Sequence, residues 1–132
     1  MLWRGWVWFL IFIDDRTTRF DVKYPVDMFK IFVMSPKEYT TKLIDAMSGA
    51  GAGVMGNYTH CAFITPGFGN WKSEEGSNPT IGEVGKMSRE SEEKIEMVCP
   101  EDKLPDVVKA IKRTHPYEIP AIDVIKMEDL IL

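Results

Sequence analysis

The stretch KIFVMSPKE (residues 30–38) decides the fold, because a similar stretch, KIEMVCPED (residues 94–102), occurs 64 positions later and aligns with it without gaps. The first part of each copy is rich in β-branched and other apolar side chains, a pattern typical of a strand. Pro36 and Pro100 occupy equivalent positions, and proline is favoured in the first turn of a helix. In the first copy, Ser35 is the predicted N-cap. Each copy therefore predicts a strand followed by a helix.

The two predicted helices also match each other position by position. In the first helix, apolar residues recur every three or four positions, so that one stripe faces a core. The same positions are apolar in the second helix. The matched pairs are Leu43 with Val107, Ile44 with Val108, Ala46 with Ala110 and Met47 with Ile111.

Residues 58–65 and 119–127 are predicted to complete each copy with a second strand. Two such β-α-β units in one small domain predict an α+β fold, the ferredoxin-like split β-α-β sandwich. We expect a four-stranded antiparallel sheet in the order 4-1-3-2, with two helices on one face. The Gly-rich segment 66–92, predicted to be a long loop, would then lie at the same end as His115, Pro116, Tyr117 and Glu118.

This ferredoxin-like domain is expected to span residues 28–132, with residues 1–27 as a Trp-rich N-terminal extension. The apolar run from Leu2 to Ile13 is shorter than the roughly 20 residues that span a bilayer. Asp14 and Asp15 follow where a signal peptide would have a small-residue cleavage site. We therefore expect an extra strand that packs on this or a neighbouring subunit, or an upstream extension of a chain whose natural start is Met28.

Composition excludes several classes of partner. The 132-residue chain has a net charge of −4, and its Lys and Arg residues do not cluster. This charge disfavours binding to nucleic acid or to acidic membranes. Cys61 and Cys99 lie in apolar runs, where a buried free thiol is the common state, so we expect a reducing, cytoplasmic compartment.

The predicted first strand is apolar on both faces, at Phe32 and Val33. A strand of this kind is buried on both sides. Two helices cover only one face of the sheet, so we predict that other copies of the chain cover the second face in a homo-oligomer. The Trp-rich N-terminal strand is the rival cover.

Candidate ligands lie in three places in the sequence. The pair His60 and Cys61 would point to opposite faces of a strand, which argues against chelation of one ion and favours structural roles. His115 closes the second helix, where the helix dipole and the following proline explain it, yet His115, Tyr117 and Glu118 also form a plausible ligand wall. Acidic residues in the Gly-rich segment favour a cation or metal over a phosphate.

We therefore predict no catalytic residues, since the sequence has no Ser-His-Asp order and no nucleophile elbow. The predicted ligand-binding residues are Asn57, Tyr58, Glu75, Asn78 and Tyr117. The predicted metal ligands, drawn from adjacent subunits, are His60, His115 and Glu118. A divalent metal ion is the candidate cofactor.

Three segments, residues 56–61, 75–82 and 115–118, together resemble the PII/CutA-like domain of Nif-three-like (NGG-interacting factor) proteins. The resemblance runs from about Met28 to Met127. It implies a ferredoxin-like subunit and a trimer like that of CutA proteins, which are associated with divalent-metal tolerance. It does not bring the dinuclear metal centre of full-length members, whose ligands belong to flanking lobes, nor the GTP cyclohydrolase label sometimes attached to them.

Three functions follow in order of preference. The first is a regulatory, non-enzymatic trimer that binds a small ligand or divalent metal at subunit clefts. The second is a structural or protein-interaction domain without a ligand. The third is a metal-dependent hydrolase related to Nif-three-like proteins.

Overall fold

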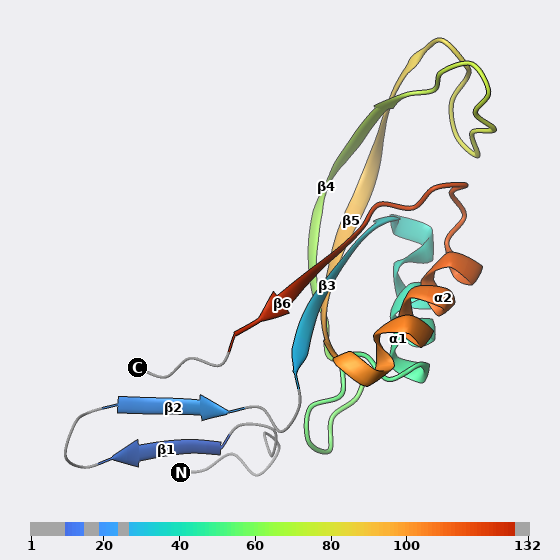
Figure 1. Ribbon diagram of the computed structural model, residues 1–132. Helices are drawn as coiled ribbons and strands as arrows, with labels where there is room; N and C mark the ends of the chain where they lie inside the picture. The colour runs from blue at the N-terminus through green and yellow to red at the C-terminus, as the bar shows by residue number, and fades with distance from the viewer. Residues whose placement is uncertain (1–9, 15–18, 24–26, 129–132) are drawn as a thin grey trace.

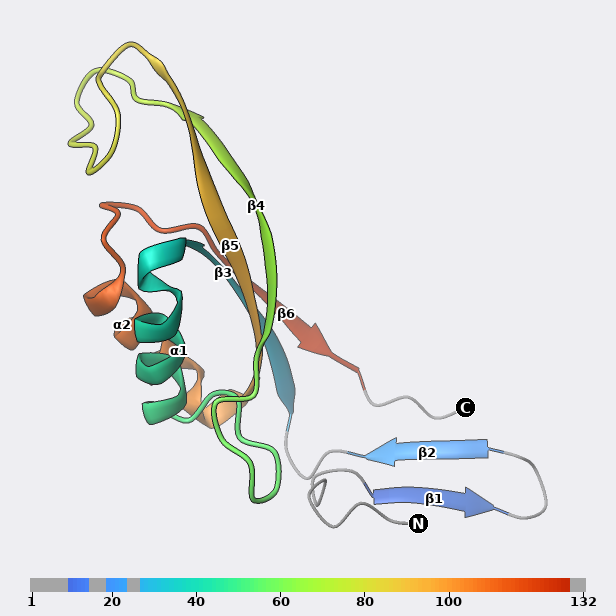
Figure 2. The ribbon, with the colours of Figure 1, turned by 180° about the vertical axis from the view of Figure 1, so that it is seen from behind.

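The computed structural model describes residues 10–14, 19–23 and 27–128, with side chains described from Asp27 onward. Its body is a four-stranded antiparallel sheet that carries α1 (Thr40–Gly49) and α2 (Leu104–Thr114) on one face (Figures 1 and 2). The strands are β3 (Met28–Pro36), β4 (Phe63–Lys72), β5 (Met87–Pro100) and β6 (Ile122–Met127). They lie in the order β4-β5-β3-β6. When β3 to β6 are counted as strands 1 to 4 of the domain and the sheet is followed from β6 to β4, this is the predicted order 4-1-3-2. The predicted fold class is confirmed.

The internal repeat extends to the helix starts, with one correction. A single 3-10 turn precedes each helix, η1 (Lys37–Tyr39) before α1 and η2 (Glu101–Lys103) before α2. Ser35 was predicted as an N-cap, but it lies within β3, and its hydroxyl donates to the Pro36 carbonyl at 2.8 Å. A residue before proline is pushed toward extended backbone, so the strand continues to Pro36 and the helix begins later.

The core lies between the sheet and the two helices. Its sheet side chains alternate along β3 and β5, and its helix side chains follow the predicted stripe. Its fully or almost fully buried members are Ile31, Val33, Leu43, Met47, Ala52, Ile95, Met97, Cys99, Val107 and Ile111. Burial raises the pKa of the Cys99 thiol to about 11, as expected of an inert core cysteine.

The predicted loop 66–92 is wrong at both ends. β4 continues to Lys72 and β5 begins at Met87, so only residues 73–86 are outside the ladder. Because pairing with β3 ends at Glu92, the two strands project beyond the body as a two-stranded arm, residues 68–72 and 87–91 (Figure 1). The proline in this stretch, Pro66, misled the prediction. It is tolerated because β4 is an edge strand.

The N-terminal region forms a separate two-stranded sheet of β1 (Leu10–Asp14) and β2 (Arg19–Lys23). β1 overlaps the end of the apolar run, residues 2–13, in which an extra strand was predicted. The three tryptophans of this region lie outside the described residues, so the predicted cover of the sheet stays a prediction. Within the described part of the chain, no helix has the length and apolar character to cross a membrane.

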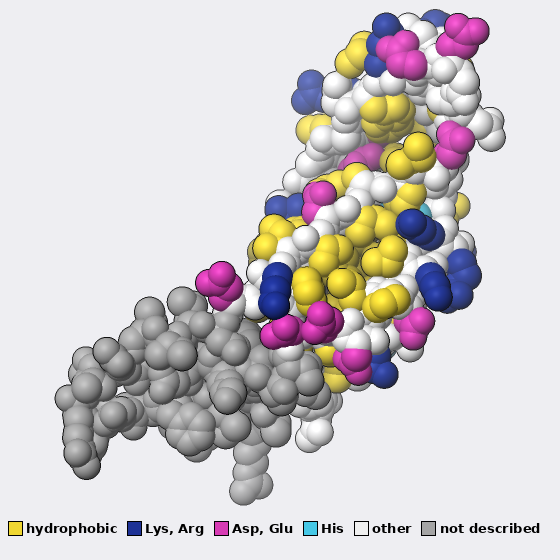
Figure 3. Space-filling view, in the orientation of Figure 1, with side chains coloured by type: hydrophobic (Ala, Val, Ile, Leu, Met, Phe, Trp, Pro, Cys, Tyr) yellow, Lys and Arg dark blue, Asp and Glu magenta, His cyan; other side chains and the backbone are white. Residues whose placement is uncertain are grey.

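The sheet face opposite the helices carries exposed apolar side chains. Phe63 pairs with Glu96, and Ile125 pairs with Lys30, in positions that alternate with the buried core residues. Phe63 is 68% exposed and Ile125 is 56% exposed. Figure 3 shows another side of the molecule, the β6 edge with the helices at the right, where hydrophobic side chains gather on the middle of the body and continue toward the arm.

Candidate functional site

A cleft of about 500 Å³ lies where the arm, the loop 73–86 and the segment after α2 meet. Its walls come from four parts of the chain that are far apart in sequence. One wall is aromatic, because the rings of Trp71 and Tyr117 lie 5.6 Å apart at 53° to each other. The residues that line it are Met34, Gly69, Asn70, Trp71, Lys72, Ser73, Glu74, Ser77, Pro79, Thr80, Ile81, Glu92, Tyr117, Glu118, Ile119 and Ala121.

Hydrogen bonds hold the loop against the segment after α2. The amide of Asn78 donates to a Glu118 carboxylate oxygen at 3.0 Å. The hydroxyl of Thr80 donates to the Pro116 carbonyl at 2.6 Å. The predicted placement of the Gly-rich segment beside residues 115–118 is therefore confirmed, and these bonds close one side of the cleft.

His115 joins the segment after α2 to β3 through hydrogen bonds of its ring. It is 6% exposed, and its ring Nδ1 accepts a hydrogen bond from the Tyr117 amide at 3.1 Å. Nε2 therefore carries the proton and donates to the Met34 carbonyl at 2.7 Å. Burial lowers the pKa of His115, although the bond to Met34 and the charge of Glu92 act in the opposite direction.

This arrangement corrects the predicted role of His115. The helix dipole was predicted to explain a histidine at this helix end, but the lowered pKa means that the ring is neutral near neutral pH and gains little from the dipole. Both ring nitrogens are already in hydrogen bonds. His115 therefore has no free lone pair for a metal in this conformation, and it acts as a positioning residue for Tyr117.

Glu92 supplies the carboxylate at the base of the cleft. One of its oxygens accepts a hydrogen bond from the Tyr117 hydroxyl at 2.9 Å. The space for this carboxylate comes from Gly69, where an added Cβ would lie only 2.4 Å from the carboxyl carbon of Glu92. The absence of a side chain at Gly69 thus allows the Glu92 carboxylate to lie close to the backbone of β4.

The field at the cleft is negative. Burial and then the hydrogen bond and charge of Glu92 raise the pKa of Tyr117, with further contributions from Glu90 and Glu38. Three carboxylates and one lysine line the cleft, and that lysine, Lys72, is 3.3 Å from Glu74. Among the residues that the structure describes, Glu92 and Glu118 have no ion-pair partner, so their charge is uncompensated.

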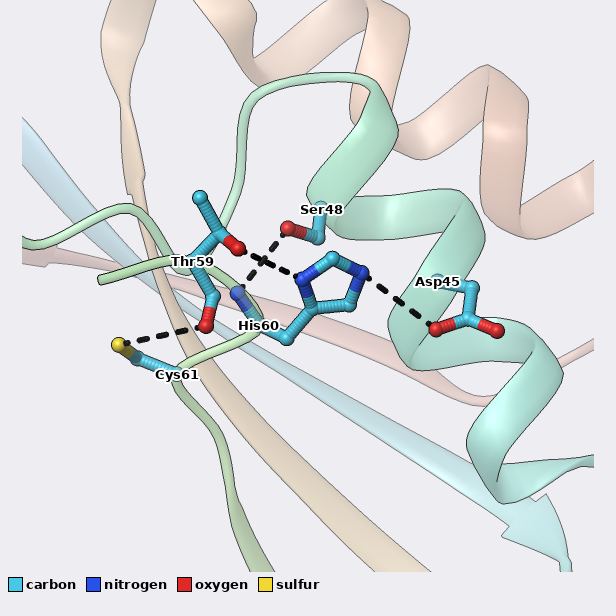
Figure 4. Close-up of polar contacts among 5 residues, drawn as sticks. All are labelled: Asp45, Ser48, Thr59, His60 and Cys61. Carbon is cyan, nitrogen blue, oxygen red and sulfur yellow. Dashed lines mark hydrogen bonds and ion pairs between the residues drawn. The ribbon is translucent and has the colours of Figure 1, made fainter. Parts of the chain in front are cut away.

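His60 lies at the opposite end of the subunit, after α1 (Figures 1 and 4). Its Nε2 is 3.4 Å from an Asp45 carboxylate oxygen, and its Nδ1 is 2.8 Å from the Thr59 hydroxyl. The His60 amide donates to the Ser48 hydroxyl at 3.1 Å. The residue has φ of 59°, which is unusual for a residue with a side chain. Half of its side-chain surface is exposed.

The segment that carries His60 is folded back on the core by Gly53. The Gly53 amide donates to the Val98 carbonyl at 2.7 Å, and its carbonyl accepts from the Cys61 amide at 2.9 Å. A Cβ at Gly53 would lie 2.7 Å from the Cys61 carbonyl oxygen. This tight turn places His60 and Cys61 before β4 begins, so the predicted strand from Tyr58 starts at Phe63 instead.

The predicted site residues therefore separate into two groups. Tyr117 and Glu118 line the cleft, the amide of Asn78 holds its edge, and Glu75 lies in the same loop without lining it. Asn57, Tyr58 and His60 lie in the exposed segment at the other end. In residues 27–128, no three His, Cys, Asp or Glu side chains are grouped to hold a metal ion. The predicted metal ligands do not form a site within one chain.

Sequence analysis did not select Trp71, Glu92 or Met34 as site residues. Trp71 was hidden in a segment predicted to be a loop, and Glu92 lies at the predicted end of that loop. Correct pairing of the arm would have found Glu92, because Gly69 and Glu92 lie on the same face, two positions apart in the ladder. The aromatic pair of Trp71 and Tyr117 had no local signal.

Comparison with known proteins gives a consistent relationship. A scan against protein-family models finds no match. A GTP cyclohydrolase 1 type 2 homolog from Halalkalibacterium halodurans is 42% identical over 96 residues, 73% of this chain and 26% of the relative. The Bacillus subtilis protein of the same description is 40% identical over 99 residues, 75% of this chain and 26% of the relative. This chain thus spans about a quarter of the curated relatives that it matches.

The match to the protein of that description from Listeria innocua is longer, at 39% identity over 120 residues, which is 90% of this chain and 32% of the relative. That share is larger than residues 28–132 alone, so the similarity extends into the N-terminal extension, where the resemblance was predicted to be absent.

Two solved structures show the same fold. A Bacillus cereus protein related to NIF3 superposes with a TM-score of 0.69 at 34% identity, over 81% of this chain and 27% of that chain. The divalent cation tolerance protein CutA from Archaeoglobus fulgidus superposes with a TM-score of 0.58 at 19% identity, over 76% of this chain and 84% of that chain. Together with the sequence matches, these structures confirm the resemblance predicted from the three segments.

Proposed function

This chain resembles a NIF3-like domain with a CutA-like fold, and on that premise we propose that it is a non-enzymatic, trimeric module that binds a small ligand in the arm cleft. The observation that carries the proposal is the cleft itself. Its walls come from β3, β4, β5, the loop 73–86 and the segment after α2. Pockets of this volume with apolar walls and a few polar groups are the usual form of small-molecule sites.

The trimer is proposed from the helix-free sheet face. Exposed apolar side chains such as Phe63 and Ile125 lie on this face beside charged partners such as Glu96 and Lys30, and exposed apolar surface is typical of an interaction site. In a closed ring of three copies, each copy would place this face against a different patch of its neighbour, in a heterologous contact. One solved structure with this fold is named a divalent cation tolerance protein. That name supports a metal ion as an alternative ligand, bound between subunits by His60 and Glu118.

Native mass spectrometry of the purified protein tests both parts of this proposal together. We expect a trimer that retains a small additional mass, which identifies the cargo as a metal or a metabolite. A monomer contradicts the assembly. A trimer without additional mass favours the second function, a protein-interaction domain without a ligand.

That second function, a protein-interaction domain without a ligand, is favoured by one feature of the arm. Phe68 is 67% exposed, and the guanidinium of Arg89 lies over its ring, 4.8 Å from the ring centre. Met87, also on the arm, is 63% exposed. The third predicted function, a metal-dependent hydrolase, has no comparable support among residues 27–128, which group no three potential metal ligands.

We also propose that residues 28–132 form the folded domain and that the extension is separable from it. Asp27, the last residue of the extension, is bound to the domain. Its carbonyl accepts a hydrogen bond from the Glu101 amide at 2.9 Å, and its carboxylate is 2.9 Å from the Lys126 ammonium. Removal of residues 1–27 is expected to leave a folded oligomer with a cooperative thermal transition. Aggregation of the shortened chain in size-exclusion chromatography would show instead that the Trp-rich segment is part of the core.

A further inference from the structure

We infer that the arm cleft selects a small organic cation, such as a quaternary or primary ammonium compound, by placing it between the Trp71 and Tyr117 rings and the Glu92 carboxylate. This inference rests on the proposed function and names the chemical class of its ligand. It follows from the wall chemistry of the cleft.

The aromatic corner provides the first part of the recognition. Trp71 and Tyr117 are both partly buried, and their rings enclose an angle of 53° rather than stacking face to face. Both residues line the cleft, so a ligand in the cleft lies against this tilted aromatic pair. The negative face of an aromatic ring attracts a cation, and tryptophan is the best of the aromatic side chains for this contact.

The carboxylates provide the second part. Glu92 lies against the Tyr117 hydroxyl at 2.9 Å and is held there through the space above Gly69. Its second oxygen remains available to a ligand. Glu118 lines the same cleft, and Lys72, the lysine on its wall, is balanced by Glu74. A partly buried carboxylate without a cationic partner attracts a positively charged guest more strongly than an exposed one does.

The same features disfavour an anion. Among the residues that the structure describes, no arginine lines the cleft, and no helix begins there to offer free amides to a phosphate or carboxylate. Burial, followed by the hydrogen bond and the charge of Glu92, raises the pKa of Tyr117, in line with a site that disfavours added negative charge. An apolar cation satisfies both the aromatic walls and the uncompensated carboxylates.

The test uses three probes that share one bulky head. Choline carries a trimethylammonium group, 3,3-dimethyl-1-butanol is its neutral carbon isostere, and 3,3-dimethylbutanoate is an anion with the same tert-butyl head. Each probe is titrated into the ¹⁵N-labelled full chain at constant ionic strength, while the indole N–H resonance of Trp71 is followed. Its assignment comes from the signal that disappears in Trp71→Phe.

We expect choline to shift this resonance in a saturable manner and to bind at least about fivefold more tightly than the neutral isostere. Glu92→Gln keeps an acceptor for the Tyr117 hydroxyl but removes the charge. It is expected to weaken choline binding by about fivefold or more and to leave binding of the neutral isostere unchanged. Glu83→Gln is the matched control, because Glu83 pairs with Lys86 in the same loop but does not line the cleft.

Three outcomes overturn the inference, and they separate it from the proposed function. If the neutral isostere or the anion binds as well as choline, the cleft binds ligands but does not select cations, and the proposed function survives. If Glu92→Gln and Glu83→Gln weaken choline binding equally, the selectivity comes from the general charge of the loop. If no probe shifts the Trp71 resonance, the cleft does not bind a cation of this class and the inference fails, whereas the proposed function still depends on the native mass spectrum.

Discussion

The two histidines of this chain stand at opposite ends of the subunit and differ in almost every physical respect. His115 is buried, uses both ring nitrogens in hydrogen bonds to the backbone, and supports a cleft. His60 is half exposed, contacts only side chains with its ring, and lies beside no comparable cleft among the described residues. Sequence analysis proposed both as metal ligands. The comparison teaches that burial and the partner atoms decide what a histidine does.

The sharpest way to break this comparison is to replace each histidine by alanine. His115→Ala leaves the Met34 carbonyl without its donor and removes the support of Tyr117, at a cost of about 3 kcal/mol in unfolding free energy. His60→Ala removes an exposed ion pair and is expected to cost less than about 1 kcal/mol. Urea denaturation of both variants measures the difference. Equal losses would refute the assignment of His115 as the structural residue.

A smaller effect is expected at the cleft itself. Tyr117→Phe removes the hydroxyl that donates to Glu92 but keeps the ring against Trp71. We expect a loss of about 1.5 kcal/mol, because the lost bond is to a charged acceptor in a partly buried site. Tyr58→Phe is the matched control at the other end, since Tyr58 is 54% exposed. A Tyr117→Phe variant as stable as the control would show that this hydrogen bond contributes nothing.

The dependence of stability on pH sharpens the comparison further. The folded pKa of His115 lies below its ordinary value near 6.5, so the unfolded chain binds a proton that the folded chain resists. Its contribution to stability is therefore complete above about pH 6.5 and is lost as the pH falls below that value toward the folded pKa. We expect the melting temperature to fall between pH 7.5 and 5.5. His115→Gln should lose this part of the slope, and parallel curves would contradict the prediction.

The smallest effect concerns the backbone of His60. Its φ of 59° is adopted at no steric cost by glycine but is unfavourable for alanine. His60→Gly and His60→Ala lose the same ring contacts. The glycine variant is therefore expected to be about 1 kcal/mol more stable than the alanine variant. If differential scanning calorimetry ranks them in the reverse order, the segment has relaxed out of the left-handed conformation.

The arm and the cleft show where prediction from the sequence ended. Pro66, Gly67 and Gly69 carry local signals of a loop, yet these residues form strand because β5 pairs with them along their whole length. The loop boundaries were therefore misplaced, and Trp71 and Glu92 were not recognised as site residues. The placement of the loop beside residues 115–118 was nevertheless predicted, because it follows from the order of strands and helices rather than from any one residue.

The sequence by itself determined the repeat, the strand order and the helix stripes. These depend on periodicity and on proline positions, which act within a few residues of the chain. The tertiary structure alone decided how long the arm is, which charges face Tyr117 and which histidine is buried. These depend on contacts between residues far apart in the chain, such as His115 with Met34 and Asn78 with Glu118. Their free energies exist only once the sheet has brought the partners together.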